Sequence, residues 1–553
     1  MREVSIRFSG LTGQGIEFAT EILAEACVLK GLNIHTYRWF PTIVRGGYTF
    51  SEIRISEDPV KALADTLDIL ILLDEIGLRD LEGFLKRDSI VIVDEDFREV
   101  QLDAKIIKIP LRRASIETKS RSNIIAIGFI SGLLGLDIMD ISKILEKKIK
   151  KKELLEFNLK GLESGYRIFL ESGLPDIKIS GTSKVKTIVQ GSDLVALAAL
   201  SAGCKFFAGY PITPSTGIME RLMKWMPEVG GLAVQVEDEL AAINMIIGAS
   251  YAGARAMTVT SGPGFSLMVE GIGFAAMAEV PIVVVDVQRV GPSTGLPTAH
   301  EQSDIDLTTH PSHGDIPRIV LAPSIIEEYY TMTVDAFKLA DKYRCPVILL
   351  LDQAYVMNYY SIDVLEVVRV SERKTVYRPR GEILQVFPRY TDLEDLPSPP
   401  LEGYLIVASS VEHDERGLSS QDGLVHVEMS IRRMKKLREL EDNPINWEVL
   451  GELDACEAIV SVGSCRPAVE EALSKIKDKK IMHIPLKQLW PLPRKLGEVL
   501  ANIEKVYVVE QNASGQLLNL ISSKIPKSSE VKSIRKFDGH PFRPREIYHE
   551  IVE

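Results

Sequence analysis

The hydrophobic positions of the chain fall into short uninterrupted runs, separated by longer amphipathic or small-residue segments. In the first third, residues 67–73 (LDILILL) and 90–93 (IVIV) have the length and apolar continuity of parallel strands buried on both faces. Residues 4–8 alternate like a strand, and residues 16–30 have the spacing of an amphipathic helix. The pattern predicts an α/β fold for this region.

The same alternation of apolar runs and helical segments continues through the rest of the chain. The predicted strands are residues 256–260, 280–287, 346–351, 404–408, 458–462, 480–484 and 506–509. The helical segments between the earlier ones are rich in alanine and glycine, which favours close packing of helices on a sheet. We therefore expect a multi-domain α/β protein built on parallel sheets.

Two polar breaks divide this pattern into three regions. Residues 177–190, with a Gly-Thr-Ser core, and residues 371–400, rich in proline and charge, have the composition of linkers. The domains expected on this basis are residues 1–176, 191–370 and 401–553.

Composition narrows the class of protein. A chain of 553 residues has room for roughly three or four domains. Its net charge of −12 argues against a general nucleic-acid binder, and no apolar run is long enough to span a membrane.

The five cysteines have no CxxC spacing, so we expect neither a metal site nor an iron–sulfur cluster in this chain. Cysteines scattered singly and an N-terminus without the features of a signal peptide predict a cytoplasmic protein. The cysteines are Cys27, Cys204, Cys345, Cys456 and Cys465.

A glycine turn follows the first predicted strand. Gly10, Gly13 and Gly15 lie in FSGLTGQG, between that strand and the helix at residues 16–30. Glycines in this position let backbone amides approach a phosphate at a helix N-terminus. The spacing is not that of a dinucleotide-binding turn, so a ligand site and a plain tight turn are about equally favoured.

A stiff turn is predicted at residues 209–216, GYPITPST. Its two prolines disfavour both helix and sheet, so the turn should be extended and should present the hydroxyl groups of Thr213, Ser215 and Thr216. By themselves, these residues favour a Ser or Thr cap for a helix that begins near Ile218.

One carboxylate stands out in the segment QVEDELAAINMIIGASYAGA. Glu239 precedes a long apolar, small-residue stretch, so its side chain should face a dry interior. A buried carboxylate without a basic neighbour is costly unless something pairs with it. The partner could be a nitrogen atom of a ligand, although the favourable dipole at a helix N-terminus is a sufficient structural explanation.

Two further turns follow predicted strands. They are residues 260–266 (TSGPGFS) and 288–298 (QRVGPSTGLPT), and both should lie at the carboxyl ends of parallel strands, where open α/β sheets bind ligands. Arg289 follows a buried strand directly and could bind a carboxylate with its five donors. A salt bridge to Asp286 or a domain contact would explain it equally well.

In their order, these segments closely resemble the α subunit of 2-oxoacid:ferredoxin oxidoreductases. Residues 301–323 (EQSDIDLTTHPSHGDIPRIVLAP) and the later segments KQLWPLPRKL, VVEQNASGQ and FDGHPFRP continue the resemblance. FSGLTGQG and PTIVRGG resemble the γ subunit of that enzyme. The resemblance implies a γ-type α/β domain, a thiamine-diphosphate-binding (pyrimidine-type) α/β domain and a transketolase C-terminal-like α/β domain.

The family resemblance also implies an activity. Such enzymes use thiamine diphosphate to decarboxylate a 2-oxoacid oxidatively, form an acyl-CoA and reduce ferredoxin. A separate β subunit supplies the Mg²⁺ and diphosphate site and a [4Fe-4S] cluster. The GDG…N motif and cysteine cluster of that subunit are missing from this sequence. We therefore expect the chain to act together with a β subunit, with ferredoxin, a 2-oxoacid and CoA as its other partners.

The resemblance gives several residues a function. Glu239 matches the glutamate that hydrogen-bonds the pyrimidine N1′ and promotes its imino tautomer. Arg289 matches the arginine that binds the substrate carboxylate, Thr213 matches a hydroxyl that contacts the substrate, and Thr298 is a possible pocket residue. Further candidates on the thiamine side are Tyr210, Pro211 and Gly262, and those for CoA are Gly10, Gly13, Gly15, Arg45 and Gly46.

Some alternatives stay open at this level. Thr12 stands where γ domains more often have glycine, which weakens the prediction of a CoA contact at this turn. The preferred 2-oxoacid is not fixed, since the β subunit shapes part of the pocket, but a γ–α fusion favours 2-oxoglutarate or a broad range over pyruvate alone. A non-catalytic scaffold that has kept the fold is the alternative of a different class.

Overall fold

A computed structural model describes residues 3–42, 46–79, 81, 83–98, 102–181, 186–371, 385–391 and 404–553. The chain divides into two compact units. Unit 1 comprises Met1–Gln190, Asn358–Glu366 and Arg543–His549, and unit 2 comprises Gly191–Met357, Val367–Phe542 and Glu550–Glu553. No helix in these described ranges is both long enough and apolar enough to cross a membrane.

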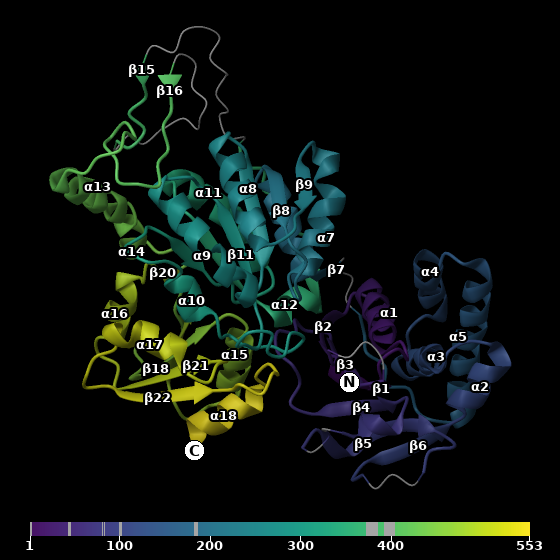
Figure 1. Cartoon of the computed structure of the whole chain (residues 1–553). Coiled ribbons are helices and arrows are strands. Elements are labelled where there is room, and N and C mark those ends of the chain that lie inside the picture. The colour runs from purple at the N-terminus through teal and green to yellow at the C-terminus, as the bar shows by residue number, and fades with distance from the viewer. Residues whose placement is uncertain are drawn as a thin grey trace. The chain divides into compact units, whose positions relative to one another are not determined.

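Unit 1 is built on an eight-stranded mixed sheet in the described ranges, in the order β6-β5-β4-β1-β3-β2-β14-β7 (Figure 1). β4 pairs in parallel with β1 and β5, which confirms the buried parallel strands predicted at residues 67–73 and 90–93. The strands are β1 (Glu3–Leu11), β2 (Asn33–Trp39), β3 (Tyr48–Ser56), β4 (Leu67–Leu72), β5 (Leu85–Asp94), β6 (Lys105–Ile109), β7 (Lys186–Gln190) and β14 (Tyr359–Asp363).

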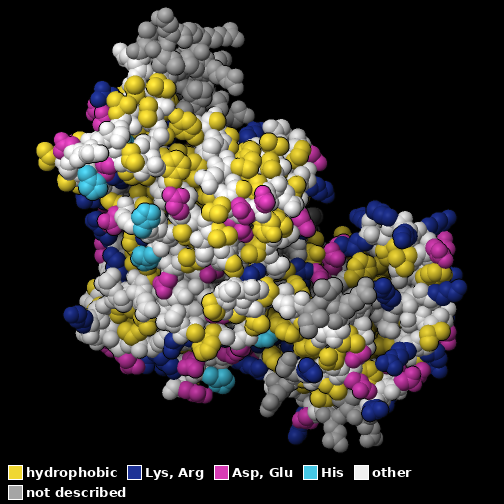
Figure 2. All heavy atoms as spheres, viewed as in Figure 1, with side chains coloured by type: hydrophobic (Ala, Val, Ile, Leu, Met, Phe, Trp, Pro, Cys, Tyr) yellow, Lys and Arg dark blue, Asp and Glu magenta, His cyan; other side chains and the backbone are white. Residues whose placement is uncertain are grey.

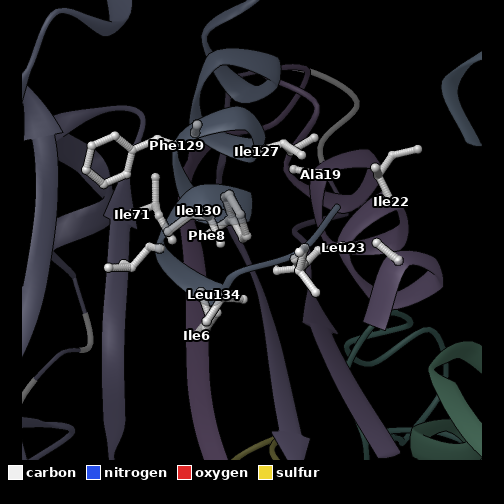
Figure 3. Close-up of a cluster of buried hydrophobic side chains, with 14 of the residues drawn as sticks. Ile6, Phe8, Ala19, Ile22, Leu23, Ile71, Ile127, Phe129, Ile130 and Leu134 are labelled. Carbon is white, nitrogen blue, oxygen red and sulfur yellow. The ribbon is translucent and has the colours of Figure 1, made fainter. Parts of the chain in front are cut away.

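Helices cover the sheet of unit 1 and bury its central strands. Nearly every residue of α3 is buried, in keeping with its largely apolar sequence. Figure 3 shows the resulting core, in which side chains of β1 and β4 meet those of α1 and α3. The helices are α1 (Ile16–Leu29), η1 (Glu75–Leu78), α2 (Leu111–Thr118), α3 (Ser122–Leu134), α4 (Ile138–Lys148) and α5 (Lys152–Ser172).

Two late segments of the chain complete unit 1. The sequence pattern placed residues 358–366 in the second domain, but β14 pairs antiparallel with both β2 and β7. Tyr360 stacks on His35 at 4.5 Å between ring centroids, and the Tyr359 amide donates to Thr36 Oγ1 at 2.7 Å. The start of α18 (Pro544–Val552) also belongs to unit 1. The pairing of β14 with β2 joins residues that are more than 300 positions apart.

Unit 2 contains a seven-stranded sheet in the order β20-β12-β13-β11-β10-β8-β9, parallel throughout except where β20 pairs with β12. Its strands are β8 (Cys204–Gly209), β9 (Leu232–Gln235), β10 (Arg255–Thr260), β11 (Val283–Gln288), β12 (Ile319–Leu321), β13 (Val347–Asp352) and β20 (Gln488–Trp490). The helices around it are α6 (Gly191–Ser201), α7 (Thr216–Trp225), η2 (Pro227–Val229), α8 (Glu239–Tyr251), α9 (Gly262–Met277), α10 (Ile305–Thr309), α11 (Glu328–Tyr343) and α12 (Gln353–Met357).

A second, mainly parallel sheet of unit 2 has the order β17-β19-β18-β21-β22. The strand predicted at residues 404–408 is shorter than expected, and it pairs with β15 and not with this sheet. The separate pair consists of β15 (Gln385–Val386) and β16 (Tyr404–Leu405). The strands of the five-stranded sheet are β17 (Leu450–Gly451), β18 (Glu457–Val462), β19 (Ile481–Leu486), β21 (Lys505–Glu510) and β22 (Glu530–Arg535). The helices are α13 (Gly423–Lys435), α14 (Arg438–Asp442), α15 (Cys465–Lys475), α16 (Arg494–Leu500), α17 (Gln516–Ile521) and η3 (Ser522–Lys524).

Candidate active site

The four motifs of the second domain emerge from four neighbouring strands of one sheet. The strands β11, β10, β8 and β9 are adjacent and mutually parallel, so their carboxyl ends lie along the same edge. Residues 288–298, which begin with Gln288 and Arg289 and are called the arginine turn below, follow β11, and residues 260–266, the SGPG turn, follow β10. The GYPITPST turn follows β8, and Glu239 follows β9. Open α/β sheets bind their ligands at such an edge.

The GYPITPST turn contacts the arginine turn directly. A guanidinium nitrogen of Arg289 donates to the backbone oxygen of Thr213, while Arg289 itself is only 6% exposed. Tyr210 and Pro211 are exposed on the same turn. The arrangement brings together two of the predicted substrate-contacting residues.

The predicted hydroxyl cap of the following helix is wrong. α7 begins at Thr216, and its N-cap residue Ser215 makes no side-chain capping bond. The Ser215 hydroxyl donates instead to the backbone oxygen of Ile212 at 2.9 Å, within the turn. This hydroxyl therefore stabilises the turn that carries Thr213 and not the helix.

Glu239 lies in a nearly closed position at the start of α8. The side chain is 6% exposed, and its carboxylate has no hydrogen-bond or ion-pair partner in the part of the chain that the structure describes. The neighbouring Asp238 performs the capping, since its side chain accepts from the Ala241 amide at 2.7 Å. Capping therefore does not explain Glu239, and its carboxylate is available to a partner from outside the chain.

The SGPG turn leaves space for two carboxyl groups. A Cβ atom on Gly264 would lie 2.3 Å from Glu239 Oε1 and 2.1 Å from Thr260 Oγ1. A Cβ atom on Gly262 would lie 2.9 Å from both carboxyl oxygens of Asp304. Any side chain at these two positions would displace one of the carboxyl groups, which gives both glycines a physical explanation.

The charges of Asp286 and Asp304 act on Arg289. Burial raises the pKa of the Asp286 carboxyl well above its usual range; Asp304 adds to the effect and Arg289 opposes it. Burial likewise raises the pKa of Asp304 to about 6, against the opposing effect of Arg289. Burial lowers the pKa of the Arg289 guanidinium, and the two aspartates counteract this change. The arginine and both acids are thus electrostatically linked.

Thr298 lies on the loop that follows Arg289. The amide of Val290 donates to the oxygen of Ala299 at 3.2 Å, and the amide of Leu296 donates back to Val290 at 3.3 Å. The loop therefore returns to the residue beside Arg289, and the half-buried Thr298 lies where it does so.

The CoA candidates lie in unit 1. The amide and the hydroxyl of Thr12 both donate to the Gly47 oxygen, at 2.9 and 3.1 Å, so the glycine turn and the loop with Gly46 are neighbours. The Cβ position of Gly10 faces the Gln14 side chain and that of Gly15 faces Asn123, whereas those of Gly13 and Gly46 are open. Arg45 lies outside the described residues.

Asp304 is the site residue that sequence reasoning missed. It lies within the EQSDID segment, which carries a family resemblance but no local structural pattern. The available signal was Gly262, a small residue at a helix start with no helix-capping function of its own, which implies that something approaches it closely.

Comparisons with known proteins agree with this arrangement. Residues 197–433 match the thiamine diphosphate-binding domain of pyruvate flavodoxin/ferredoxin oxidoreductases. Residues 5–168 match the family model named pyruvate ferredoxin/flavodoxin oxidoreductase, and residues 455–547 match pyruvate:ferredoxin oxidoreductase core domain II. The region that contains Thr213, Glu239 and Arg289 is thus a thiamine diphosphate-binding domain.

Individual relatives extend the match to the whole chain. The chain is 37% identical to the 2-oxoglutarate synthase subunit KorA of Methanothermobacter marburgensis, over 66% of this chain and 98% of the relative. It is 28% identical to the α subunit of 2-oxoacid:ferredoxin oxidoreductase 2 of Aeropyrum pernix, over 99% and 97% of the two chains.

A solved structure agrees with the computed one over its full length. It is the 2-oxoglutarate:ferredoxin oxidoreductase of Magnetococcus marinus, with 2-oxoglutarate, coenzyme A and succinyl-CoA bound. The TM-score is 0.91 at 32% identity, and the match covers 100% of this chain and 99% of the other. The chain therefore belongs to the 2-oxoacid:ferredoxin oxidoreductases, as an α subunit with a γ-like domain at its N-terminus.

Proposed function

We propose that this chain, together with a separate β subunit, catalyses the CoA-dependent oxidative decarboxylation of a 2-oxoacid to an acyl-CoA and CO₂ and reduces ferredoxin. The observation that carries the proposal is that Thr213, Glu239 and Arg289 follow strands that end along one edge of a sheet in a thiamine diphosphate-binding domain. The preferred substrate proposed is 2-oxoglutarate, because relatives over most of the chain are 2-oxoglutarate enzymes.

The residues present fit the aminopyrimidine ring of thiamine diphosphate. A buried carboxylate without an internal partner is suited to a ring nitrogen, and Glu239 is such a group. When bound, the cofactor supplies the nucleophilic carbon and accepts the electron pair that CO₂ leaves behind. Glu239 would hold a proton at the ring nitrogen, and the nearly closed surroundings would exclude water from that hydrogen bond.

Arg289 and Thr213 would bind and orient the 2-oxoacid. The guanidinium is fixed by its bond to the Thr213 backbone, and its Nε atom has no hydrogen-bond partner in the described structure. This leaves donors for a substrate carboxylate. The Thr213 hydroxyl, on the same turn, would contact the oxo or carboxylate oxygen.

A second subunit would complete the site. Exposed hydrophobic side chains gather on the face of unit 2 over α8 and α9, the two helices that begin beside Glu239 (Figure 2). Leu240, Met245 and Leu267 are among them. Such a patch is typical of a surface that another chain covers, and we propose that the β subunit, carrying Mg²⁺ and the [4Fe-4S] cluster, covers this one. CoA would bind at the glycine turn of unit 1, with Gly13 and Gly46 as the open positions.

The substrate assignment is tested with the co-purified complex. Reduction of a viologen dye is measured with CoA and a panel of 2-oxoacids that includes 2-oxoglutarate, pyruvate and branched-chain acids. We expect the highest kcat/KM with 2-oxoglutarate, and acyl-CoA and CO₂ as products. A complex with full thiamine diphosphate and cluster content that turns over none of these acids contradicts the proposed function.

Replacing Arg289 by alanine is expected to raise the KM for the 2-oxoacid by about 10- to 100-fold, the value of a charge-assisted hydrogen bond to a carboxylate. Thr213→Val, which removes only the hydroxyl and keeps the backbone oxygen, should have a smaller effect in the same assay. Arg221→Ala is the matched control, because Arg221 lies outside the turn, on α7, and pairs with Asp193 on α6. Equal KM values for Arg289→Ala and Arg221→Ala would exclude substrate binding by Arg289.

A further inference from the structure

A buried carboxylate lies between the arginine turn and the five-stranded sheet of unit 2. Asp352 is the last residue of β13 and is 1% exposed. Its Oδ1 atom accepts from Gln288 Nε2 at 2.7 Å, and its Oδ2 atom accepts from Gln302 Nε2 at 2.8 Å and from the Ser464 amide at 2.6 Å. Hydrogen bonds to an ionised carboxylate are about twice as strong as those between neutral groups. Asp352 therefore fixes three separate segments of the chain at one point.

One of these bonds holds the arginine turn itself. Gln288 is the first residue of the turn, lies opposite Asp352 in the register of β11 and β13, and directly precedes Arg289. Gln288 Oε1 accepts from the Asp304 amide at 3.3 Å, so both polar atoms of this side chain are bonded. The backbone from which Arg289 extends is thereby held beside β13.

The other bonds lead to the five-stranded sheet. The Gln302 amide donates to the Gln511 oxygen at 2.6 Å, and Gln302 Oε1 accepts from the Gln511 amide at 3.0 Å. Asn512 Nδ2 donates to the Gln302 backbone oxygen at 3.0 Å. Gly463 follows β18 with a φ of +53°, and a Cβ atom there would lie 2.4 Å from Asp352 Oδ2. Only glycine allows this close approach of the sheet to the carboxylate.

A second connection reaches the arginine turn through the segment before α10. The Ser303 hydroxyl donates to the Arg289 backbone oxygen at 3.3 Å. Gln516, on α17, donates to the Ser303 backbone oxygen at 2.9 Å and accepts from the Asp306 amide at 3.0 Å. The C-terminal part of unit 2 thus holds the chain at Arg289 and just before it, although none of the proposed catalytic residues lies in that part.

We propose that Asp352 is a positioning residue for substrate binding: it holds the arginine turn against the five-stranded sheet and so fixes Arg289 where its guanidinium receives the carboxylate of the 2-oxoacid. The inference rests on the proposed function, because it assigns Arg289 to the substrate. Asp352 acts through the arginine and not on the reacting atoms. An interaction made equally in the ground state and the transition state contributes to KM and not to kcat, so a misplaced Arg289 should raise KM.

The test measures kcat and the KM values for the 2-oxoacid and for CoA in the co-purified complex. Asp352→Asn keeps the size of the side chain but turns an NH₂ group toward a hydrogen-bond donor. We expect the KM for the 2-oxoacid to rise about tenfold, the contribution of about one charge-assisted hydrogen bond. The kcat and the KM for CoA should stay within about twofold of wild type. An unchanged KM for the 2-oxoacid overturns the proposal.

A paired substitution gives a rescue that a general loss of packing would not show. Gln288→Glu alone sets two carboxyl groups against each other and should also raise the KM. In Gln288→Glu/Asp352→Asn the donor and the acceptor are exchanged, so the bond between the two side chains can form again. The new amide oxygen can still accept from Gln302 and the Ser464 amide, because a carbonyl oxygen has two lone pairs. We expect the KM of the double variant to return to within about threefold of wild type, and a KM as high as that of Asp352→Asn contradicts the proposal.

Glu328→Gln is the matched control for a loss of stability alone. Glu328 is 8% exposed and joins α11 to α15 through Arg466. Its hydrogen bonds, to Ser324, Ile325 and Arg466, do not reach the arginine turn. The substitution should lower the Tm of the complex but leave the KM for the 2-oxoacid within about twofold of wild type.

Gln516→Ala decides if Asp352→Asn yields no folded complex, because it breaks the second connection at a half-buried side chain. A raised KM for the 2-oxoacid at an unchanged kcat then supports the proposal, and a wild-type KM overturns it. If wild type turns over and Arg289→Ala raises the KM but Asp352→Asn does not, this inference fails and the proposed function stands. If wild type turns over no 2-oxoacid, the proposed function itself fails.

Discussion

Glu239→Gln should lower kcat by about 10²- to 10⁴-fold, the usual contribution of a positioned acid–base group. Glutamine has nearly the same size and keeps a hydrogen-bonding oxygen, but it cannot exchange a proton with a ring nitrogen. Since Glu239 is 6% exposed and is not the residue that caps α8, the substitution should leave the helix and the binding of the β subunit unchanged. Viologen reduction by the reconstituted complex with its best 2-oxoacid measures the effect.

Glu237→Gln is the control for this experiment. Glu237 lies two positions earlier and is exposed, so the same change of charge should leave kcat within about twofold. Thiamine diphosphate content and co-purification with the β subunit are recorded for both variants. If Glu239→Gln turns over at the rate of Glu237→Gln, then the carboxylate does not act on the cofactor, and its burial needs another explanation.

The second large effect concerns stability. Glu52, on β3, is 2% exposed and bonds two arginines: Arg7 Nε at 2.9 Å and Arg543 Nη2 at 2.9 Å. Phe84 lies under the guanidinium groups of both. Glu52→Ala removes the buried carboxylate that both guanidinium groups share and should destabilise unit 1 by about 3–5 kcal/mol. Hydrogen exchange of peptides from β1 and β3 measures the loss.

The same cluster predicts an acid sensitivity. Burial alone would raise the pKa of Glu52, but Arg543 and Arg7 outweigh it and lower the pKa to about 2. Because the folded pKa is below the ordinary value, this stabilisation is fully present above about pH 4.5 and is lost as the pH falls toward 2.

Glu3→Ala is the control for Glu52→Ala, since the ion pair of Glu3 with Arg54 at 2.8 Å is partly exposed and should contribute at most about 1 kcal/mol. Similar exchange rates in the two variants would show that burial of the cluster adds nothing.

Local patterns predicted the elements of this fold well. The apolar runs became β4, the end of β5 and β13, because a strand covered on both faces needs apolar residues at most positions. The pattern could not assign β14 to unit 1, because its partners β2 and β7 lie far away in the sequence. The sequence of a strand predicts that the segment is a strand, but it does not predict the strand with which it pairs.

In the candidate site, too, local patterns predicted some residues, whereas contacts between distant segments were not predicted. Glu239 and Arg289 were predicted because an acid and a base at the ends of apolar segments are unusual in themselves. Asp304 was missed, since its significance depends on its close approach to Gly262, which only the folded chain creates. A helix cap was expected at Ser215 because serine is a common capping residue, but its hydroxyl donates a hydrogen bond to a backbone oxygen within the turn instead.

The discontinuity of unit 1 has a consequence for biosynthesis. A ribosome makes the first 190 residues early, yet β14 and the Arg543–His549 segment are among the later parts to emerge. Until β14 arrives, β2 is an open edge of the nascent sheet and β7 has no neighbour to pair with. The fold of unit 1 can therefore be completed only after nearly the whole polypeptide has been synthesised. A chain that terminates before residue 543 lacks Arg543, the second of the two arginines that bind Glu52.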